Sequence, residues 1–583
     1  MKNKSMALLW LLLALLIFIP IKLSAQIELV PVDNDVYPFL EKLSLEGLID
    51  FNQSNIPISR RAIASYLEEI EAEKGKLSRT EQNILSDLFL EFSFDINKNL
   101  HDSYSFTGEF KPANALKIFS DKKQKYLASY ADSNFSIFLD GVGAVSYRDF
   151  DAQGSPRAAA SLFEIGPRLS GTINNSIGFY VQVTEGQTLT GEQHARSVIG
   201  GTDPLVNDPL LVASQKFVSA KYITAFNAGY LRYESGNGNV ALMLGRDNFE
   251  LGNGYIDKLW VSDFAPPFDF ARVDLRYKFF RYTFFYGDLQ GDSLGTPQMT
   301  NNVVKSKNIV GNYLSIETSP SFRFGIYQSL ILANTPFLLS FFNPISVLES
   351  ASLNTYTSVD AKAMIGFDSE LRPCPDLGIQ ASFFFNDLNF STIGKKGSPA
   401  GNDNKFGYQL GLMYADPFGI SNLTAKVEYT LLDPFVYNSR TNMTNYTNWD
   451  ESIGTPLPPN SDQIALELNY YLTNRITINF LYRHQRSGTG FLDANGNPTL
   501  VDTGVITRNF GGDINRGDLD GKYVNNFLMG LRVNRNIFVL TSRIEPIRQY
   551  YIDLGYSYES IDDLYSSRVV SEQFFYATIS TDF

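Results

Sequence analysis

The sequence predicts an all-β fold, an antiparallel β-barrel of the outer-membrane type, with a small helical bundle before it. Three observations indicate this architecture. The chain ends in an alternating segment, residues 572–583, that finishes on Phe583. From about residue 134 onward the chain consists of alternating segments of roughly ten residues, the length of a membrane-spanning strand. The connections between these segments are alternately short and long.

The last segment has the pattern of a closing strand. Phe575, Ala577, Ile579, Thr581 and Phe583 share one mostly apolar face, and the opposite face is polar. A closed barrel pairs its last strand with its first and so leaves no exposed edge. A terminal aromatic on the apolar face resembles the C-terminal signature of bacterial outer-membrane barrels. We therefore expect Phe575, Ile579 and Phe583 to form a signal for the barrel assembly machinery.

The beginning of the chain has the features of an export signal. Lys2 and Lys4 precede an apolar run from residue 6 to residue 21, and small residues follow at 24 and 25. Residues 1–25 are therefore predicted to be a signal peptide of the Sec pathway that is removed on export. After residue 25 no apolar run approaches the roughly 20 residues that a membrane helix needs.

The composition favours a membrane barrel over a nucleic-acid-binding protein. The chain has 32 Tyr and 45 Phe among 583 residues, and barrels place such side chains in girdles at the two membrane interfaces. The formal net charge of −13 would repel phosphate, so we expect no nucleic-acid partner. Cys374 is the only cysteine, which excludes an internal disulfide.

Residues 26–100 are predicted to form a periplasmic helical bundle. Apolar residues recur at helical spacing before Gly47, and a second helix is expected from Ser59 to Gly75. A third begins with the capping-box sequence Ser78-Arg79-Thr80-Glu81. Such a bundle has little core of its own and needs a partner surface, although a solvated linker domain without a specific role is the alternative.

Residues 101–583 are predicted to form a transmembrane barrel of about eighteen strands. The expected strands lie near 134–148, 161–173, 177–187, 222–234, 239–247, 270–279, 281–291, 306–318, 321–333, 359–371, 377–390, 405–415, 421–433, 462–473, 475–487, 523–535, 549–560 and 572–583. Residues 537–548, which include Pro546, fit no strand in this scheme, so sixteen to eighteen strands are compatible with the pattern.

The lengths of the connections predict the orientation. Links after even-numbered strands are mostly a few residues long, whereas several links after odd-numbered strands exceed twenty residues, as in 188–221 and 434–461. Outer-membrane barrels have short periplasmic turns and long extracellular loops. The helical bundle and the C-terminus are therefore expected on the periplasmic side.

Catalysis has little support in the sequence. The three histidines, His101, His194 and His484, are too far apart to form a metal-ligand pair, and no Gly-x-Ser-x-Gly motif is present. His484 near Ser487 leaves a barrel hydrolase as a weak alternative. Two Asp- and Asn-rich stretches, 493–497 and 518–521, are more typical of turns than of calcium loops. We expect no enzyme activity, no metal and no cofactor.

Two long loops carry residues suited to sugar recognition. A pyranose ring offers an apolar face for aromatic stacking and hydroxyl groups for directed hydrogen bonds, so sugar sites combine aromatic, amide and charged side chains. The two tryptophans after the signal peptide both lie in predicted outward loops, and a membrane girdle is the alternative role for each. The residues that we expect to contact a glycan are Trp260, Tyr437, Arg440, Tyr446, Asn448, Trp449 and Asp450.

The inward faces of the predicted strands carry charges of both signs. Arg168, Arg276, Glu428 and Arg483 alternate with apolar residues, and acidic residues such as Asp140 do the same. Mixed charge of this kind suits either an interior that is cross-linked and filled or the lining of a channel, and both remain open.

Several segments resemble the Wzi capsule-assembly family. The N-terminal stretch 35–67 is similar to the helical region of that family, although surface-layer homology domains share its rhythm. Residues 245–254 and 259–267 resemble a glycine-rich turn that leads to an Ala-x-Pro bend. Residues 337–345, followed by Glu349, resemble an "aromatic, Asn-Pro, then glutamate" segment. Together these matches cover most of the mature chain.

The resemblance implies an eighteen-stranded barrel with a periplasmic helical bundle that acts as a lectin for surface polysaccharide. The implied partners are capsular or exopolysaccharide and outer-membrane lipid, and we expect a monomer. The Tyr- and Asn-rich loops at 434–461 and 488–522 depart from the family pattern and leave the glycan open. The alternatives are a porin or substrate channel and, third, a structural component of a secretion or motility complex.

Overall fold

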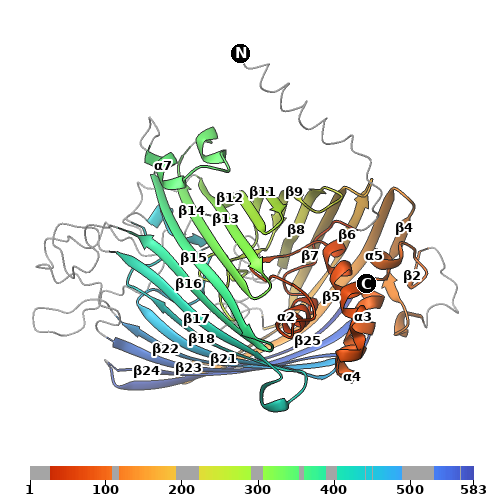
Figure 1. Ribbon diagram of the computed structural model, residues 1–583. Coiled ribbons are helices and arrows are strands. Elements are labelled where there is room, and N and C mark those ends of the chain that lie inside the picture. Colours follow the sequence, from red (N-terminus) through yellow and green to blue (C-terminus); the bar gives the residue numbers. More distant parts are fainter. Residues whose placement is uncertain are drawn as a thin grey trace, which may run out of the picture.

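A computed structural model gives the structure of the chain as a single barrel with helices at one mouth (Figure 1). The residues that it describes are 26–107, 117–191, 222–290, 306–335, 337–353, 360–388, 404–439, 442–449, 451–488, 531–564 and 566–583. The predicted signal peptide, residues 1–25, lies outside this set, as do His194 and the two Asp- and Asn-rich stretches.

The N-terminal region is helical, as predicted. Its helices are α2 (Val36–Leu45), α3 (Arg60–Ala72), α4 (Arg79–Glu91) and α5 (Ser93–Asn97). The Ser59 hydroxyl accepts a hydrogen bond from the backbone N–H of Ala62 at the start of α3. The capping box is present at α4, where Ser78 and Glu81 each accept from the other's backbone N–H. No helix among the described residues is long and apolar enough to cross a bilayer.

Eighteen long antiparallel strands form a closed barrel within the described part of the chain (Figure 1). They are β5 (Phe135–Ala152), β6 (Ala158–Ile173), β7 (Ile177–Thr190), β8 (Tyr222–Glu234), β9 (Val240–Asp247), β11 (Phe268–Tyr277), β12 (Phe280–Leu289), β13 (Lys307–Ser319), β14 (Phe322–Ala333), β15 (Asp360–Cys374), β16 (Leu377–Asp387), β17 (Lys405–Ala415), β18 (Leu423–Leu432), β21 (Ser461–Thr473), β22 (Ile476–Gly488), β23 (Leu531–Ile547), β24 (Tyr550–Asp563) and β25 (Arg568–Asp582). The short strand β4 (Ala128–Ala131) also pairs with β5.

The final strand closes the barrel, as the sequence predicts. β25 pairs with β5, and the backbone N–H of Phe583 donates to the carbonyl of Gly141 at 2.9 Å. The ring of Phe583 packs against Tyr550, with ring centroids 5.2 Å apart. Phe575 and Ile579 are exposed on the outward face of β25. Their expected recognition by the assembly machinery stays a prediction.

The expected position of the sixteenth strand was wrong. Its predicted range began at residue 523, but β23 spans Leu531–Ile547. It therefore includes residues 537–547, which were expected to fit no strand. The ladder between β23 and β24 is regular as far as Ile544 and shifts register before Ile547. Pro546 lies in this irregular end, where the missing N–H interrupts no regular pair. Residues 523–530 lie outside the described set.

The N-terminal helices cover the mouth of the barrel at the short turns. Asp87 of α4 accepts hydrogen bonds from Asn474 and Arg475 in the turn before β22. Arg61 of α3 donates to the carbonyl of Asn175 in the turn between β6 and β7. The carbonyl of Leu45 in α2 accepts from the turn between β15 and β16. The helical region is therefore attached to short turns all around one rim.

Strand alternation divides the wall into two faces. Large apolar side chains such as Leu244, Leu275 and Leu410 are exposed on the outside. Inward positions are occupied by buried aromatic and charged residues, among them Phe285 and Arg323. The outer face is the one that contacts the membrane in a barrel of this class.

Candidate functional site

The loop between β9 and β11, residues 248–267, folds into the barrel and does not extend away from it. Its first residues form the short strand β10 (Glu250–Leu251), which pairs with β1 (Asn55–Ile56) of the N-terminal region. Deeper in the lumen, the backbone N–H groups of Tyr255, Ile256 and Asp257 donate to the carboxylate of Glu428 at 2.9, 3.2 and 2.9 Å. One inward carboxylate of β18 therefore holds three consecutive residues of the loop.

A buried ion pair attaches the same loop to a second strand. The guanidinium of Arg483, on β22, donates to both carboxylate oxygens of Asp257 at 2.6 and 3.1 Å. The side-chain amide of Gln463 donates to Asp257 at 3.0 Å. Bidentate pairing of this kind fixes both partners in one geometry. The predicted inward positions of Glu428 and Arg483 are thus occupied by charges that organise a loop.

The second long loop, residues 433–460, packs on top of the first. The Tyr437 hydroxyl donates to the carbonyl of Leu259 at 2.7 Å, and the Tyr446 hydroxyl donates to the carbonyl of Trp260 at 2.9 Å. The side-chain amide of Asn448 donates to the carbonyl of Pro266 at 2.7 Å. The two loops therefore form one body inside the barrel.

Trp260 lies at the centre of this body. It is 1 % exposed, and its ring stacks on Tyr327 of β14 with centroids 4.7 Å apart and an interplanar angle of 11°. Its indole N–H donates to the Ser329 hydroxyl. A Cβ at Gly366 of the neighbouring strand would lie 2.3 Å from the Tyr327 ring, so that glycine leaves the space in which the ring lies. We call the two loops and the surrounding wall, β11–β18, the filled sector.

The structure separates the residues predicted to contact a glycan into two groups. Trp260, Tyr437, Tyr446 and Asn448 are buried, each at no more than 1 % exposure. The polar groups of Tyr437, Tyr446 and Asn448 donate to loop carbonyls, and the indole N–H of Trp260 donates to Ser329 on the wall. In this arrangement they present no surface to an external sugar. Trp449 is partly buried and has a left-handed backbone, φ 57°, at the turn between β19 (Thr447–Asn448) and β20 (Glu451–Ser452). Arg440 and Asp450 lie outside the described residues.

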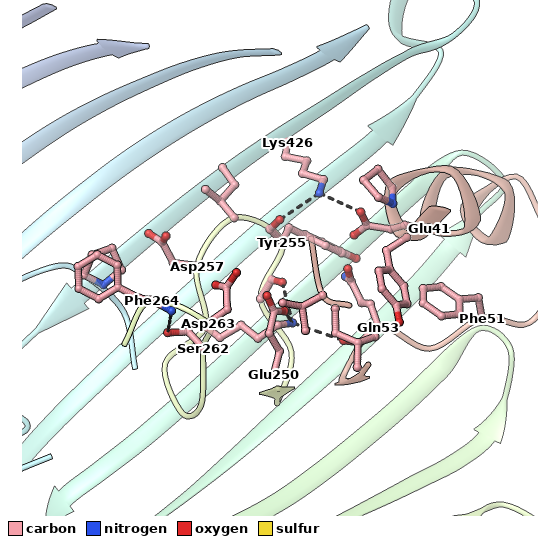
Figure 2. Close-up of a pocket in the computed structure, with 18 of the residues that line it drawn as sticks. Glu41, Phe51, Gln53, Glu250, Tyr255, Asp257, Ser262, Asp263, Phe264 and Lys426 are labelled. Carbon is pink, nitrogen blue, oxygen red and sulfur yellow. Dashed lines mark hydrogen bonds and ion pairs between the residues drawn. The ribbon is translucent and has the colours of Figure 1, made fainter. Parts of the chain in front are cut away.

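A cavity of about 290 Å³ lies between the filled sector and the N-terminal helices (Figure 2). Figure 2 shows Lys426 between Glu41 of α2 and the inward loop, and its ammonium donates to Glu41 at 2.9 Å and to the carbonyl of Tyr255 at 3.1 Å. Phe51 and Phe264 supply aromatic lining. The cavity combines charge, carbonyl groups and aromatic rings, but its cations are already paired with protein carboxylates and carbonyls.

A larger cavity of about 720 Å³ occupies the other side of the lumen. Strands β5–β8 and β22–β25 surround it, and the N-terminal segment 26–35 forms one wall. We call this part the hollow sector. Stacked rings of Tyr180 and Tyr230, 5.5 Å apart, lie beside it, and Arg168 and Arg543 are among its charged lining. The cavity has the size of a ligand-binding site and the polar lining of a water-filled one.

Glu28 is a buried ionisable group of the N-terminal segment. It is 2 % exposed, the Thr172 hydroxyl donates to one of its carboxylate oxygens at 3.0 Å, and the other oxygen has no hydrogen-bond partner among the described residues. Burial, together with the nearby Asp95 carboxylate, raises the pKa of Glu28 to about 7. The N-terminal segment 26–35 therefore holds a carboxyl group that changes charge near neutral pH.

The residues of the weak hydrolase alternative are not brought together. Arg483 faces the lumen, so alternation directs Ser487 to the same side and His484 to the opposite face. The Ser487 hydroxyl bonds to Ser461 at 2.7 Å, and His484 bonds to Asn536 at 2.9 Å. Within the described residues no group of three or more His, Cys, Asp or Glu side chains has the geometry of a metal site.

The sequence pattern did not identify the groups that hold the loops or line the cavities as parts of a site. Glu28 and Asp257 lie in irregular segments, where no periodicity indicates burial. Asp257 is followed by Lys258, and a charged pair of this kind is typical of a solvated loop, so the sequence indicates neither its burial nor its partner on β22.

Comparison with known proteins gives a family and a fold. Residues 169–536, more than half of the chain, match the family model for the capsule assembly protein Wzi. No curated protein sequence matches the chain significantly. Among solved structures, Wzi of Escherichia coli is similar with a TM-score of 0.52 and 13 % identity, over 95 % of this chain and 99 % of that chain. It is described as an outer-membrane protein involved in group 1 capsule assembly and as a carbohydrate-binding β-barrel.

Two further solved structures have lower TM-scores. OprD of Pseudomonas aeruginosa has a TM-score of 0.39 at 10 % identity, over 77 % of this chain and 95 % of that chain. OccAB3 of Acinetobacter baumannii has a TM-score of 0.41 at 11 % identity, over 77 % and 99 %. Likeness at this level carries no conclusion, whereas the family match is extensive. The chain is an outer-membrane β-barrel and belongs to the Wzi family of capsule assembly proteins.

Proposed function

We propose that this protein binds capsular or other exported polysaccharide and helps to attach or assemble it at the cell surface. Membership of the capsule assembly family is the observation that carries this proposal, and the solved Escherichia coli relative is described as carbohydrate-binding. The filled sector supports a binding role, because two long loops are immobilised inside the lumen by buried polar contacts and aromatic packing. A rigid loop body loses little entropy when it binds a ligand.

The orientation is also a proposal. The short-turn rim, with the helices and Phe583, faces the periplasm, and the long loops face outward. The hydrogen bonds between the helices and the short turns support this, since an exported N-terminal domain remains on the side from which the barrel is inserted. Residues 1–25 direct Sec export, the assembly machinery inserts the barrel into lipid as a monomer, and deletion of Phe583 is expected to lower the yield of assembled barrel.

Trp449 is the proposed contact residue for the sugar. It lies at a two-strand turn of the loop body, where its backbone has a positive φ and its side chain is less buried than those of Thr447 and Asn448 before it. An indole face stacks on the apolar face of a pyranose, and Asp450, the next residue, and Arg440 of the same loop add hydrogen-bonding groups in sequence. Trp260, Tyr437, Tyr446 and Asn448 act as the support that fixes the turn. Binding of this kind requires no catalytic step.

Retention of polysaccharide on cells tests the proposal. Cells that lack the protein are complemented with the wild-type chain or with Trp449→Ala, and polysaccharide is measured in the cell-bound and released fractions. The proposal predicts cell-bound polysaccharide with the wild type and increased release with the variant. Equal retention in the empty strain and in the complemented strain would overturn the role in attachment.

A channel is the second candidate, and the cavity of about 720 Å³ in the hollow sector is the observation that favours it. An open path through the hollow sector would conduct ions across a planar bilayer. Steady large openings without polysaccharide binding would support the channel. A low or absent conductance, with binding, would support the attachment role.

A further inference from the structure

The connection between β14 and β15 folds over the outside of the barrel. We call its described residues 337–353 the outer flap; they include a 3-10 turn, η5 (Leu339–Phe342), and the helix α7 (Leu348–Leu353). Figure 1 shows α7 beside the ends of β14 and β15. The flap resembles neither the inward loops nor the short turns, because its buried side chains contact the outer wall.

The underside of the flap packs on outward-facing residues. Phe341 and Leu348 are fully buried against a cluster that contains Phe284 and Leu330. The next residues in sequence, Phe285 and Ile331, belong to the lumen cluster around Trp260. Strand alternation therefore directs Phe284 and Leu330 outward, toward the membrane.

The flap lies at the depth of the hydrocarbon. β12 has only 10 residues, and a membrane-spanning strand needs roughly 9–11, so the whole of β12 is required to cross the bilayer. The flap contacts the middle of this strand: the Phe342 ring lies 5.6 Å from the ring of Phe284, and the Tyr282 hydroxyl donates to the carbonyl of Pro344. A segment against these residues is surrounded by lipid.

Several polar groups of the flap backbone have hydrogen-bond partners, as a lipid environment demands. Gln328, in the outward row of β14, donates to the carbonyl of Ser346 at 3.0 Å and accepts from the N–H of Leu348 at 3.0 Å. The side chain of Asn343 accepts from the N–H of Ile345 at 3.2 Å. Backbone groups in hydrocarbon lack water as a partner, so such pairing is required there. The side-chain amide of Gln328, which lies in a membrane-facing row, also has partners for both its N–H and its carbonyl group.

The upper side of the flap is apolar and exposed. Ile345 is 90 % exposed and Leu339 is 77 % exposed, and Phe337 and Val347 are also exposed. Residues 337–348 contain no charged side chain. An apolar surface of this kind is rare on the aqueous part of a protein. It is continuous with the exposed apolar residues on the outside of β14 and β15, such as Phe322 and Ile365, which face lipid.

We propose that the outer flap is a membrane-inserted clamp, with Phe337, Leu339, Ile345 and Val347 among the acyl chains of the outer membrane. The occupant of this surface is lipid hydrocarbon. The clamp thickens one side of the barrel wall next to the filled sector and covers outward residues of β12 and β14.

Fluorescence quenching by brominated lipid tests the clamp on the full chain. Cys374, the only cysteine, is replaced by serine, and Ile345→Cys is labelled with an environment-sensitive fluorophore. The labelled barrel is reconstituted into phosphatidylcholine vesicles with or without bromine on the acyl chains. Leu410→Cys, on the outward face of β17, is the control for lipid contact, and Ser155→Cys, exposed in the turn before β6, is the control for water.

The clamp predicts that brominated lipid quenches the label at 345 as strongly as the label at 410, and that the label at 155 keeps its intensity. Comparing lipids that carry bromine near the headgroup with lipids that carry it near the end of the acyl chain gives the depth of the label at 345 in the bilayer. If the label at 345 keeps its intensity in brominated lipid, as the label at 155 does, the proposal is overturned. A disulfide between two unlabelled Ile345→Cys chains, together with absence of quenching, would assign the surface to a second copy and overturn it as well.

Discussion

The two sectors of the lumen differ in what fills them. In the filled sector, two long loops pack around Trp260 and are held by Glu428 and Arg483. In the hollow sector, strands of the same barrel enclose a cavity of about 720 Å³ with a polar lining. The comparison indicates that loop burial depends on aromatic packing together with a few inward charges that find partners on the loops. In the hollow sector, Arg168 pairs with Asp140 of β5 and Asp582 of β25, both on the wall.

The difference assigns distinct roles to the two sectors. The aromatic side chains around Trp260 in the filled sector have almost no exposed surface and should act on function through the shape of the loop body. The hollow sector has a charged lining and free space, so it should respond to pH and to solutes. Substitutions in the two sectors should therefore have different effects on stability and function. The predictions below run from the largest expected change in stability to the smallest.

Trp260→Ala is expected to have the largest effect. The substitution leaves a cavity in a fully packed cluster and should lower the free energy of unfolding by about 4 kcal/mol. Tyr180→Ala, which removes an aromatic ring that already borders the hollow sector, is the matched control and should cost about half as much. Urea unfolding of the barrel in detergent measures both. Equal losses would contradict the distinction between the sectors.

Glu428→Ala tests the attachment of the inward loop. Three backbone N–H groups and two side-chain amides lose their acceptor, so we expect a loss of about 3 kcal/mol and proteolysis within residues 252–264. Asp140→Ala is the control, because this buried wall carboxylate accepts from Arg168 on the adjacent strand β6. Proteolysis that is the same in the two variants would show that Glu428 does not hold the loop.

Glu28, in the N-terminal segment 26–35, should make the free energy of unfolding depend on pH. Burial raises its pKa to about 7, above the ordinary value of 4.5, so the folded state binds a proton that the unfolded state releases between these values. The stabilising effect is complete below the unfolded pKa and is lost as the pH rises through about 7. Wild-type stability should fall by about 2 kcal/mol relative to Glu28→Gln between pH 4.5 and pH 8. Parallel pH profiles of the two proteins would contradict this assignment.

Trp449→Ala should have the smallest effect on stability and a large effect on retention. The side chain is only partly buried, so the free energy of unfolding should change by no more than about 1 kcal/mol. Polysaccharide retention should fall toward that of cells without the protein. A stability loss as large as that of Trp260→Ala would place Trp449 with the buried support.

Much of the fold follows from local patterns. Ser59 and Ser78 cap the helices that their sequences predict, because capping depends on neighbouring residues alone. Strand positions follow from alternation, and the terminal pairing of Phe583 follows from the need to close the sheet. The strand at residues 531–547 was predicted at 523–535, because a proline suits no regular ladder, whereas Pro546 lies at an irregular strand end.

The site was less predictable, since it depends on contacts between distant segments. Trp260 and Tyr446 are residue types found in sugar sites. Nothing in the residues next to them indicates that the Tyr446 hydroxyl donates to the Trp260 carbonyl. The direction of a long loop, into the lumen or away from it, depends on partners such as Glu428 that lie on strands far along the chain. The same applies to the outer flap, whose apolar sequence alone suits a buried core equally well.

Binding of purified protein to polysaccharide extracted from the cells that produce it tests the central claim most directly. The folded barrel is immobilised, and binding is measured over a range of polysaccharide concentrations for the wild type and for Trp449→Ala. A carbohydrate-binding barrel predicts saturable binding by the wild type and weaker binding by the variant at equal folded content. A correctly folded wild-type barrel that binds no polysaccharide at any concentration would contradict the claim.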